Sequence, residues 1–202
     1  MLIYYTDMYS SKKRQLESAK VTRKKISPLV WVLAIVLPFI IVFGLRNAFV
    51  GNYYVPSGSM ETTLNVGDRI FVTYANKEHP QRGDIVVFED KLGWLNSDYL
   101  TDEGFLVKRV IAIGGDTISA DENGIVYLNK LPIDEPYAEG KTTAFAEQIV
   151  PEGKFFAMGD NRENSADSRY HIQAGTQFVD TNAITGKMWL RYWPLDNLGT
   201  VK

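Results

Sequence analysis

An uncharged apolar run near the N-terminus places the strongest constraint on what this chain can fold into. The run extends from Ile26 to Leu45. As a helix rising about 1.5 Å per residue it would be about 30 Å long, which is the thickness of a bilayer's hydrocarbon core. Pro28 falls near the start of such a helix, where proline is tolerated, and Pro38 would kink its middle. We therefore expect residues 26–46 to form one transmembrane helix.

The charges around this run indicate its orientation. Seven basic residues precede Ile26, against only Asp7 and Glu17. Because basic residues stay on the cytoplasmic side of a membrane, we expect residues 1–25 to be a cytoplasmic tail and residues 47–202 to be extracellular. A cleaved signal peptide fits less well, since its apolar segment is usually about 7–15 residues long and no small-x-small cleavage pattern follows the run.

The rest of the chain reads as a β-rich domain. Short runs of β-branched and aromatic residues alternate with turns that contain glycine, and helical periodicity is weak. The expected strands are Ile70–Tyr74, Ile85–Glu89, Leu106–Ile113, Thr117–Ala120, Ile125–Leu128, Phe155–Met158 and Ile184–Leu190. We expect an all-β fold of mostly antiparallel sheets, preceded by the one N-terminal helix.

The composition narrows the chemistry that the domain can perform. The chain has no cysteine and only two histidines, His79 and His171. Disulfides, zinc–thiolate sites and cysteine nucleophiles are therefore excluded, and neither histidine has a partner at ligand spacing. We expect no metal and no cofactor. No basic stripe with interleaved aromatic residues follows the tail, so we also expect no nucleic-acid partner.

The segment Pro56–Met60, PSGSM, holds two hydroxyls on one turn. Proline fixes φ and glycine allows unusual φ, so Pro56 and Gly58 can set the directions of Ser57 and Ser59. One serine could attack a carbonyl while the other donates a hydrogen bond to the oxyanion that forms. Taken alone, the segment is more typical of an ordinary loop than of an active site.

A lysine in the apolar segment Phe105–Ile118 is a candidate base. Alternation along the expected strand places Lys108 between Leu106 and Val110 on one face. Burial disfavours the ammonium form, and a drop of about three units in the pKa of a lysine leaves a large fraction neutral at pH 7. The alternative is a lysine on an edge strand, whose stem covers the sheet while its amine reaches water.

The segment Gly159–Arg169, GDNRENSADSR, is too polar for a core. It suits a loop held rigid by ion pairs and by side chains that bond to the backbone. A solvated surface loop and a calcium site are the alternatives. The EF-hand pattern fails, because Ser165 stands where it needs glycine and Arg162 where it needs a ligand.

Together these segments resemble bacterial signal peptidase I, the family of membrane-anchored serine proteases that remove signal peptides. The resemblance runs in order through a basic tail, one membrane span, PSGSM at 56–60, RGDIVVF at 82–88, VKRVIAIGGD at 107–116 and GDNRENSADSR at 159–169. It implies a serine endopeptidase that cleaves exported preproteins after small residues, at the outer face of the cell membrane.

The resemblance also implies roles for single residues. Ser59 would be the nucleophile and Lys108 the general base of a Ser/Lys dyad. The Ser57 hydroxyl and the Ser59 backbone N–H would form the oxyanion hole, and Ser165 would orient the lysine amine through a hydrogen bond. The residues expected to brace the site through ion pairs are Arg109, Asp160, Arg162, Asp167 and Arg169.

The same resemblance sets expectations for the fold and for partners. It implies a catalytic core with a small accessory β-region at roughly residues 116–158, and it implies preproteins that bear signal peptides and the lipid bilayer as partners. Trp193 could contact the membrane surface, whereas core packing is the stronger expectation for Trp189. Two rival interpretations are a non-catalytic, membrane-tethered β-domain that binds proteins, and a Ser/Lys protease that cleaves itself or a regulatory protein.

Overall fold

A computed structural model describes residues 27–94 and 104–201, which include all the predicted site residues. The tail predicted for residues 1–25 lies outside the described residues. The chain divides into two compact units, Met1–Gly44 and Leu45–Lys202. We call the second one the β-unit, because all the described strands belong to it.

The described part of the first unit is helical and belongs to α2 (Pro28–Phe49). The helix begins at a capped end, where Ser27 Oγ accepts a hydrogen bond from the Leu29 backbone N–H at 3.3 Å. The large apolar side chains of α2 that are described are exposed. Its side chains are described only in part, and among the described residues no helix is long and apolar enough to cross a membrane.

The β-unit contains a seven-stranded sheet in the order β1-β2-β11-β3-β4-β9-β10, and all its neighbouring strands pair antiparallel. Its strands are β1 (Val50–Tyr54), β2 (Arg69–Thr73), β3 (Ile85–Glu89), β4 (Phe105–Ile113), β9 (Lys154–Met158), β10 (Val179–Asp180) and β11 (Ile184–Trp193). Short 3-10 helices lie between or after them, namely η1 (Gly58–Met60), η3 (Thr181–Ala183) and η4 (Leu195–Asn197).

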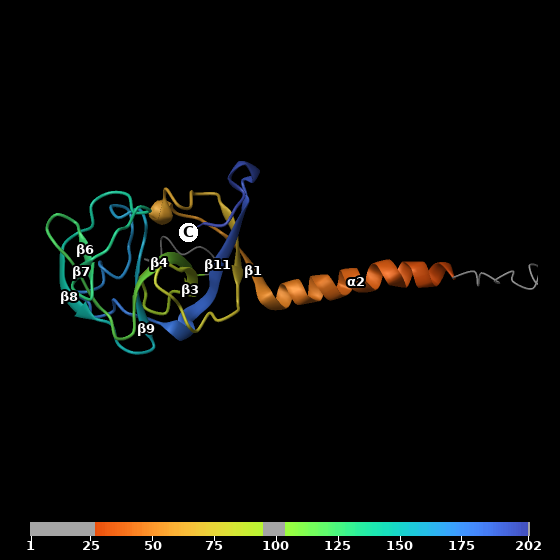
Figure 1. Ribbon diagram of the computed structural model, residues 1–202, viewed down its shortest axis with the longest axis horizontal. Helices are drawn as coiled ribbons and strands as arrows, with labels where there is room; N and C mark the ends of the chain where they lie inside the picture. The colour runs from red at the N-terminus through yellow and green to blue at the C-terminus, as the bar shows by residue number, and fades with distance from the viewer. Residues whose placement is uncertain (1–26, 95–103, 202) are drawn as a thin grey trace, which may run out of the picture. The chain divides into compact units, whose positions relative to one another are not determined.

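A second, four-stranded antiparallel sheet has the order β7-β6-β5-β8. Its strands are β5 (Thr117–Ala120), β6 (Val126–Leu128), β7 (Leu131–Pro132) and β8 (Phe145–Ile149). Figure 1 shows β6, β7 and β8 at one end of the β-unit, with β11 and β1 at the other. The predicted all-β architecture of mostly antiparallel sheets is confirmed, and we call the smaller sheet the accessory sheet.

The central position of β4 decides the environment of the candidate base. β4 pairs with β3 on one side and with β9 on the other. Its residues from Leu106 to Ala112 are all buried, because hydrophobic clusters cover both faces of the sheet there. Lys108 is therefore not on an edge strand, and the structure excludes the alternative in which its amine reaches water.

Both C-terminal tryptophans are exposed, although Trp189 was expected in the core. Trp189 is 54% exposed and Trp193 is 51% exposed, so the predicted core packing of Trp189 is wrong. The register of β11 against β2 shifts between Met188 and Leu190 and again between Arg191 and Trp193. The prediction depended on the strand-like context of Trp189, and a bulge of this kind changes the direction in which a strand side chain points.

Candidate active site

The nucleophile candidate lies on a turn that the core holds from both sides. Ser59 is in η1, and the neighbouring Val55 and Met60 pack into one hydrophobic cluster. Ser59 is only 8% exposed, whereas Ser57 is exposed. The Ser57 hydroxyl donates to Ser59 Oγ at 3.3 Å, so the two hydroxyls of the motif lie next to each other on this turn.

The base candidate reaches this turn from the centre of the main sheet. Lys108 Nζ lies 2.6 Å from Ser59 Oγ and 3.2 Å from the carbonyl oxygen of Val107. Lys108 is only 2% exposed, so water does not compete for the amine. A proton can pass directly between a hydroxyl and an amine at this separation.

The surroundings of the amine favour its neutral form. Burial is the largest influence and lowers the pKa of Lys108 from 10.5 to about 8. Asp167 and Asp160 oppose this change, while Arg169 adds to it. At pH 7 about a tenth of the molecules would then hold a neutral amine, against about one in 2,500 for an ordinary lysine.

The residue after the lysine carries a permanent charge that is also buried. The Arg109 guanidinium makes two parallel hydrogen bonds to the Asp160 carboxylate, from Nε at 2.9 Å and from Nη2 at 2.7 Å. Arg109 Nη1 also donates to the Gly83 carbonyl at 2.9 Å, and the Thr63 hydroxyl donates to Asp160 at 2.5 Å. The predicted Arg109–Asp160 pair is therefore present, and it joins β4, the loop after β9 and the segment after η1.

A second buried ion pair fixes the loop that follows β9. Arg169 Nε and Nη2 donate to the Asp167 carboxylate at 2.9 and 2.7 Å. Asp167 also accepts from the Gly159 backbone N–H at 2.9 Å, and Arg169 Nη2 donates to the Arg162 carbonyl at 3.0 Å. These bonds close the polar segment upon itself, as the sequence indicated.

Arg162 is paired with a residue that the sequence did not indicate. Its Nη1 and Nη2 donate to the Glu135 carboxylate at 2.8 and 2.7 Å, and Nη1 also donates to the Thr142 hydroxyl at 2.6 Å. Glu135 lies in the segment between β7 and β8 of the accessory sheet. The accessory sheet therefore contributes directly to the support of the site.

The hydrogen bond predicted between Ser165 and the lysine amine is absent, since the amine is directed at Ser59 Oγ and the Val107 carbonyl instead. Ser165 Oγ is buried and has no hydrogen-bond partner in the part of the chain that the structure describes. A Cβ added at Gly159 would collide with this hydroxyl and with the Ser59 carbonyl. Gly159 thus makes room for the close approach of the two segments.

Asn161 is a further site residue that sequence reasoning missed. Its backbone N–H donates to the Ser59 carbonyl at 3.2 Å, and its side-chain amide donates to the Gly58 carbonyl at 3.1 Å. These bonds fix the two peptide units around the nucleophile. The signal was available, because an amide within a rigid polar loop is well suited to bind backbone groups of a neighbouring turn.

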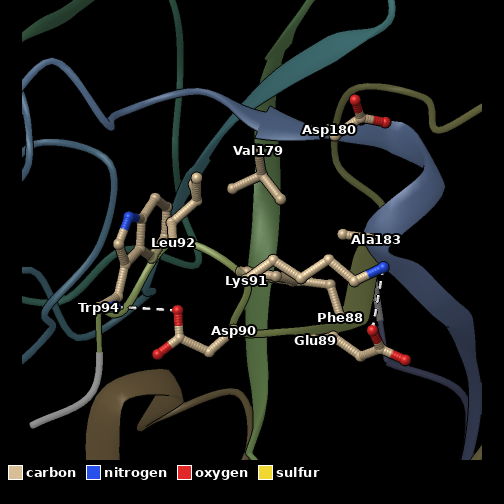
Figure 2. A pocket seen from close by; sticks show the side chains of 9 residues that line it. All are labelled: Phe88, Glu89, Asp90, Lys91, Leu92, Trp94, Val179, Asp180 and Ala183. Carbon is tan, nitrogen blue, oxygen red and sulfur yellow. Dashed lines mark hydrogen bonds and ion pairs between the residues drawn. The ribbon is translucent and has the colours of Figure 1, made fainter.

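A small hollow elsewhere in the β-unit is not connected with this chemistry. Its volume is about 40 Å³, and Phe88, Val179 and Ala183 are among the nine residues that line it. Figure 2 shows Lys91 beside Glu89 at its rim, where the two form an ion pair at 3.0 Å, and it shows the Asp90 carboxylate bonded to Trp94. None of the nine is a predicted site residue. Within residues 27–94 and 104–201 no cluster of three or more histidines and carboxylates could hold a metal ion.

Comparisons with known proteins match most of the chain. The family described as signal peptidase, peptidase S26, matches residues 29–193. A signal peptidase I of Leptolyngbya laminosa is 33% identical over 180 residues, which cover 87% of this chain and 85% of that protein. Signal peptidase I S of Bacillus subtilis strain 168 is 36% identical over 168 residues, which cover 76% and 84%. A solved signal peptidase I from Enterococcus faecalis V583 is 28% identical and aligns over 54% of this chain and 95% of its own, with a TM-score of 0.41.

Proposed function

The chain belongs to the signal peptidase family, peptidase S26, and we propose that Ser59 and Lys108 form the Ser/Lys dyad with which it cleaves signal peptides. The enzyme is a signal peptidase I, a serine endopeptidase that acts on preproteins bearing signal peptides. The observation that carries the dyad is the 2.6 Å separation of Lys108 Nζ and Ser59 Oγ within a buried site.

In the first step the neutral amine of Lys108 accepts the proton of the Ser59 hydroxyl while Oγ attacks the scissile carbonyl. The ammonium that results gives this proton to the leaving amine, which becomes the N-terminus of the mature protein. Water then gives a proton to the amine and attacks the ester. Cleavage of the ester returns the proton from Lys108 to Ser59 and releases the signal peptide as a carboxylic acid, which then loses its own proton to the solvent.

The oxyanion of each tetrahedral intermediate would be bound by the Ser57 hydroxyl and the Ser59 backbone N–H. Ser57 is supported in this role by its position beside Ser59 Oγ, which places a donor close to the attacked carbon. Rotation of the Ser57 hydroxyl toward the oxyanion would exchange its present bond for a stronger one to a charged acceptor.

Ser165 is proposed to serve the lysine once it is protonated. An ammonium has three N–H donors, whereas among the described residues the Lys108 side chain bonds to two oxygen atoms, Ser59 Oγ and the Val107 carbonyl. The buried Ser165 hydroxyl has an unused lone pair and lies beside the nucleophile turn. Ser165→Ala should therefore lower kcat more than Ser119→Ala on β5 does. The two variants should have the same free energy of unfolding.

The ion-paired residues would hold the two reacting groups at their separation. Arg109 and Asp160 connect the strand that bears the lysine to the loop after β9. The other three bracing residues, Arg162, Asp167 and Arg169, fix that loop. A catalytic geometry supported by several rigid, buried pairs requires little reorganisation during the reaction.

We also propose that residues 26–46 anchor the enzyme in the cell membrane, with residues 1–25 in the cytoplasm and the catalytic residues 47–202 outside. The uncharged run, the basic tail and the exposed apolar side chains of α2 support this topology. The exposed Trp189 and Trp193 support contact of the β-unit with the bilayer surface.

The dyad is tested by cleavage of a preprotein across pH 6–10. Ser59→Ala and Lys108→Ala should each abolish cleavage at a small-x-small junction, while Ser119→Ala and Lys130→Ala, which remove the same side chains elsewhere, should leave it intact. Wild-type activity should rise with pH, and the midpoint of this rise should lie near pH 8. Equal cleavage by all variants would refute the dyad and favour a contaminating protease or a non-catalytic binding domain.

The anchor is tested separately, with a chain that starts at residue 47. It should still cleave a soluble peptide. It should remain in the supernatant when membranes are pelleted, whereas the full chain should sediment with them. If the full chain is recovered in the soluble fraction without detergent, residues 26–46 are not an anchor.

A further inference from the structure

The segment that links β7 to β8 returns from the accessory sheet to the active-site loop. The Glu139 backbone N–H donates to the Asp160 carbonyl at 2.8 Å, and the Arg162 backbone N–H donates to the Glu139 carbonyl at 2.8 Å. The segment therefore runs beside the loop after β9 in a parallel bridge between Glu139 and Asn161. We call residues 133–142 the return segment.

The return segment places an aromatic ring against the buried arginine of β4. The Arg109 Cζ lies 3.9 Å from the centre of the Tyr137 ring. The Tyr137 hydroxyl donates to Glu135 at 2.9 Å, and Glu135 in turn binds the Arg162 guanidinium. Burial and the nearby Glu135 raise the pKa of Tyr137, so the phenol keeps its proton and remains a donor.

The Arg109 guanidinium thus has one partner in its plane and another over its face. Asp160 takes the Nε and Nη2 hydrogen atoms in the plane, and the Tyr137 ring covers the guanidinium carbon. A cation over an aromatic face is attracted by the ring, and the attraction strengthens when water is excluded. The ring therefore limits the directions in which the guanidinium can move away from Asp160.

The position of Arg109 matters for the reaction because Arg109 follows Lys108 in the strand. The charged groups that act on the Lys108 amine are Asp160, Asp167 and Arg169, and Arg109 compensates the first of them. If the guanidinium were released, the charge of Asp160 would act on the amine with less compensation and water could enter. Both changes favour the ammonium form.

We propose that Tyr137 is a positioning residue, which holds Arg109 against Asp160 and thereby keeps Lys108 aligned with Ser59. This inference rests on the proposed function of the Ser/Lys pair. It assigns the accessory sheet a part in catalysis, since the return segment that carries Tyr137 lies between β7 and β8 of that sheet. Tyr137 itself contacts no reacting atom.

The test compares three variants of the full chain in detergent. Tyr137→Leu removes the ring, whereas Tyr137→Phe keeps the ring and removes only the hydroxyl. The control is Tyr127→Leu, which also replaces a tyrosine by leucine. Tyr127 is a half-buried residue of the accessory sheet, and its hydroxyl donates to Asp121. Tyr137→Leu should lower kcat by about twofold to thirtyfold, with KM little changed. The acid limb of its kcat profile should also move to higher pH.

The other two variants make the result specific. Tyr137→Phe should retain the wild-type acid limb, and Tyr127→Leu should leave both kcat and the limb unchanged. An unshifted limb in a folded Tyr137→Leu protein would overturn the inference, and so would an equal loss in Tyr127→Leu. Lys108→Ala distinguishes failure of the dyad from failure of the positioning role. If Lys108→Ala is inactive and Tyr137→Leu has the wild-type pH profile, the dyad stands and only the positioning role of Tyr137 is refuted.

Discussion

Replacement of Lys108 by methionine should abolish cleavage and yet stabilise the folded protein at neutral pH. The buried amine has its pKa lowered from 10.5 to about 8. A shift of this size corresponds to about 3 kcal/mol against the charged folded state. Methionine has a similar length and no charge to bury, but it loses the contact with Ser59 Oγ, which is worth about 1 kcal/mol. We therefore expect a gain of about 2 kcal/mol in the free energy of unfolding at pH 7.

The sign of the pH dependence follows from the direction of the shift. Folded Lys108 binds its proton more weakly than unfolded Lys108 does, so unfolding takes up a proton between about pH 8 and pH 10.5. Wild-type stability therefore increases relative to the variant as pH rises through this window. The advantage of the variant should be complete below about pH 8 and should disappear toward pH 10.5.

Urea unfolding of the full chain in detergent, followed by tryptophan fluorescence at pH 6 to 10, measures this difference. Lys130→Met is the matched control, because it makes the same side-chain change at an exposed lysine and removes no buried amine. The reasoning would be refuted if Lys108→Met were destabilised to the same extent at every pH. That result would mean that burial does not act against the ammonium form.

Three further predictions concern the support of the dyad. Ser57→Ala should lower kcat by about 10²–10³-fold in initial-rate measurements, with an unchanged melting temperature, because it removes one oxyanion donor. Asp160→Asn should cost about 3–5 kcal/mol in urea unfolding, since it leaves the charge of Arg109 buried without a counter-charge, and a cost below 1 kcal/mol would contradict this. Gly159→Ala should inactivate and destabilise the enzyme, because a Cβ there would collide with the backbone of η1, whereas Gly199→Ala has open space and should behave as wild type in both assays.

Local patterns in the sequence were sufficient for much of the fold. β3 and β5 have the predicted bounds, and β4 begins one residue earlier than expected. The strands that were not predicted are β1, β7, β8 and β10. β7 and β10 have only two residues each, and β8 is mostly exposed, so neither length nor apolar alternation distinguishes them from loops.

The candidate site was predictable where its residues lie within the recognised segments. The Arg109–Asp160 pair joins two such segments and is present. The partner of Arg162 could not be found in this way. Glu135 lies outside the recognised segments, and only the folding of the return segment against the loop after β9 brings it to the arginine. The burial of Lys108 likewise depends on β3 and β9, which pair with β4 on its two sides. β9 is distant from β4 in the sequence, so its pairing with β4 cannot be read from the local pattern.

The connection between β4 and β9 has a consequence for how such an enzyme can change in length. The two strands are hydrogen-bonded neighbours, so the chain leaves the main sheet after Ile113 and re-enters it at Lys154, one strand away. Residues could be added to or deleted from the far hairpins of this excursion without separating its ends. Replacement of the whole excursion by a tight turn would preserve the pairing of the main sheet, but it would remove the Tyr137 ring from Arg109 and the Glu135 carboxylate from Arg162.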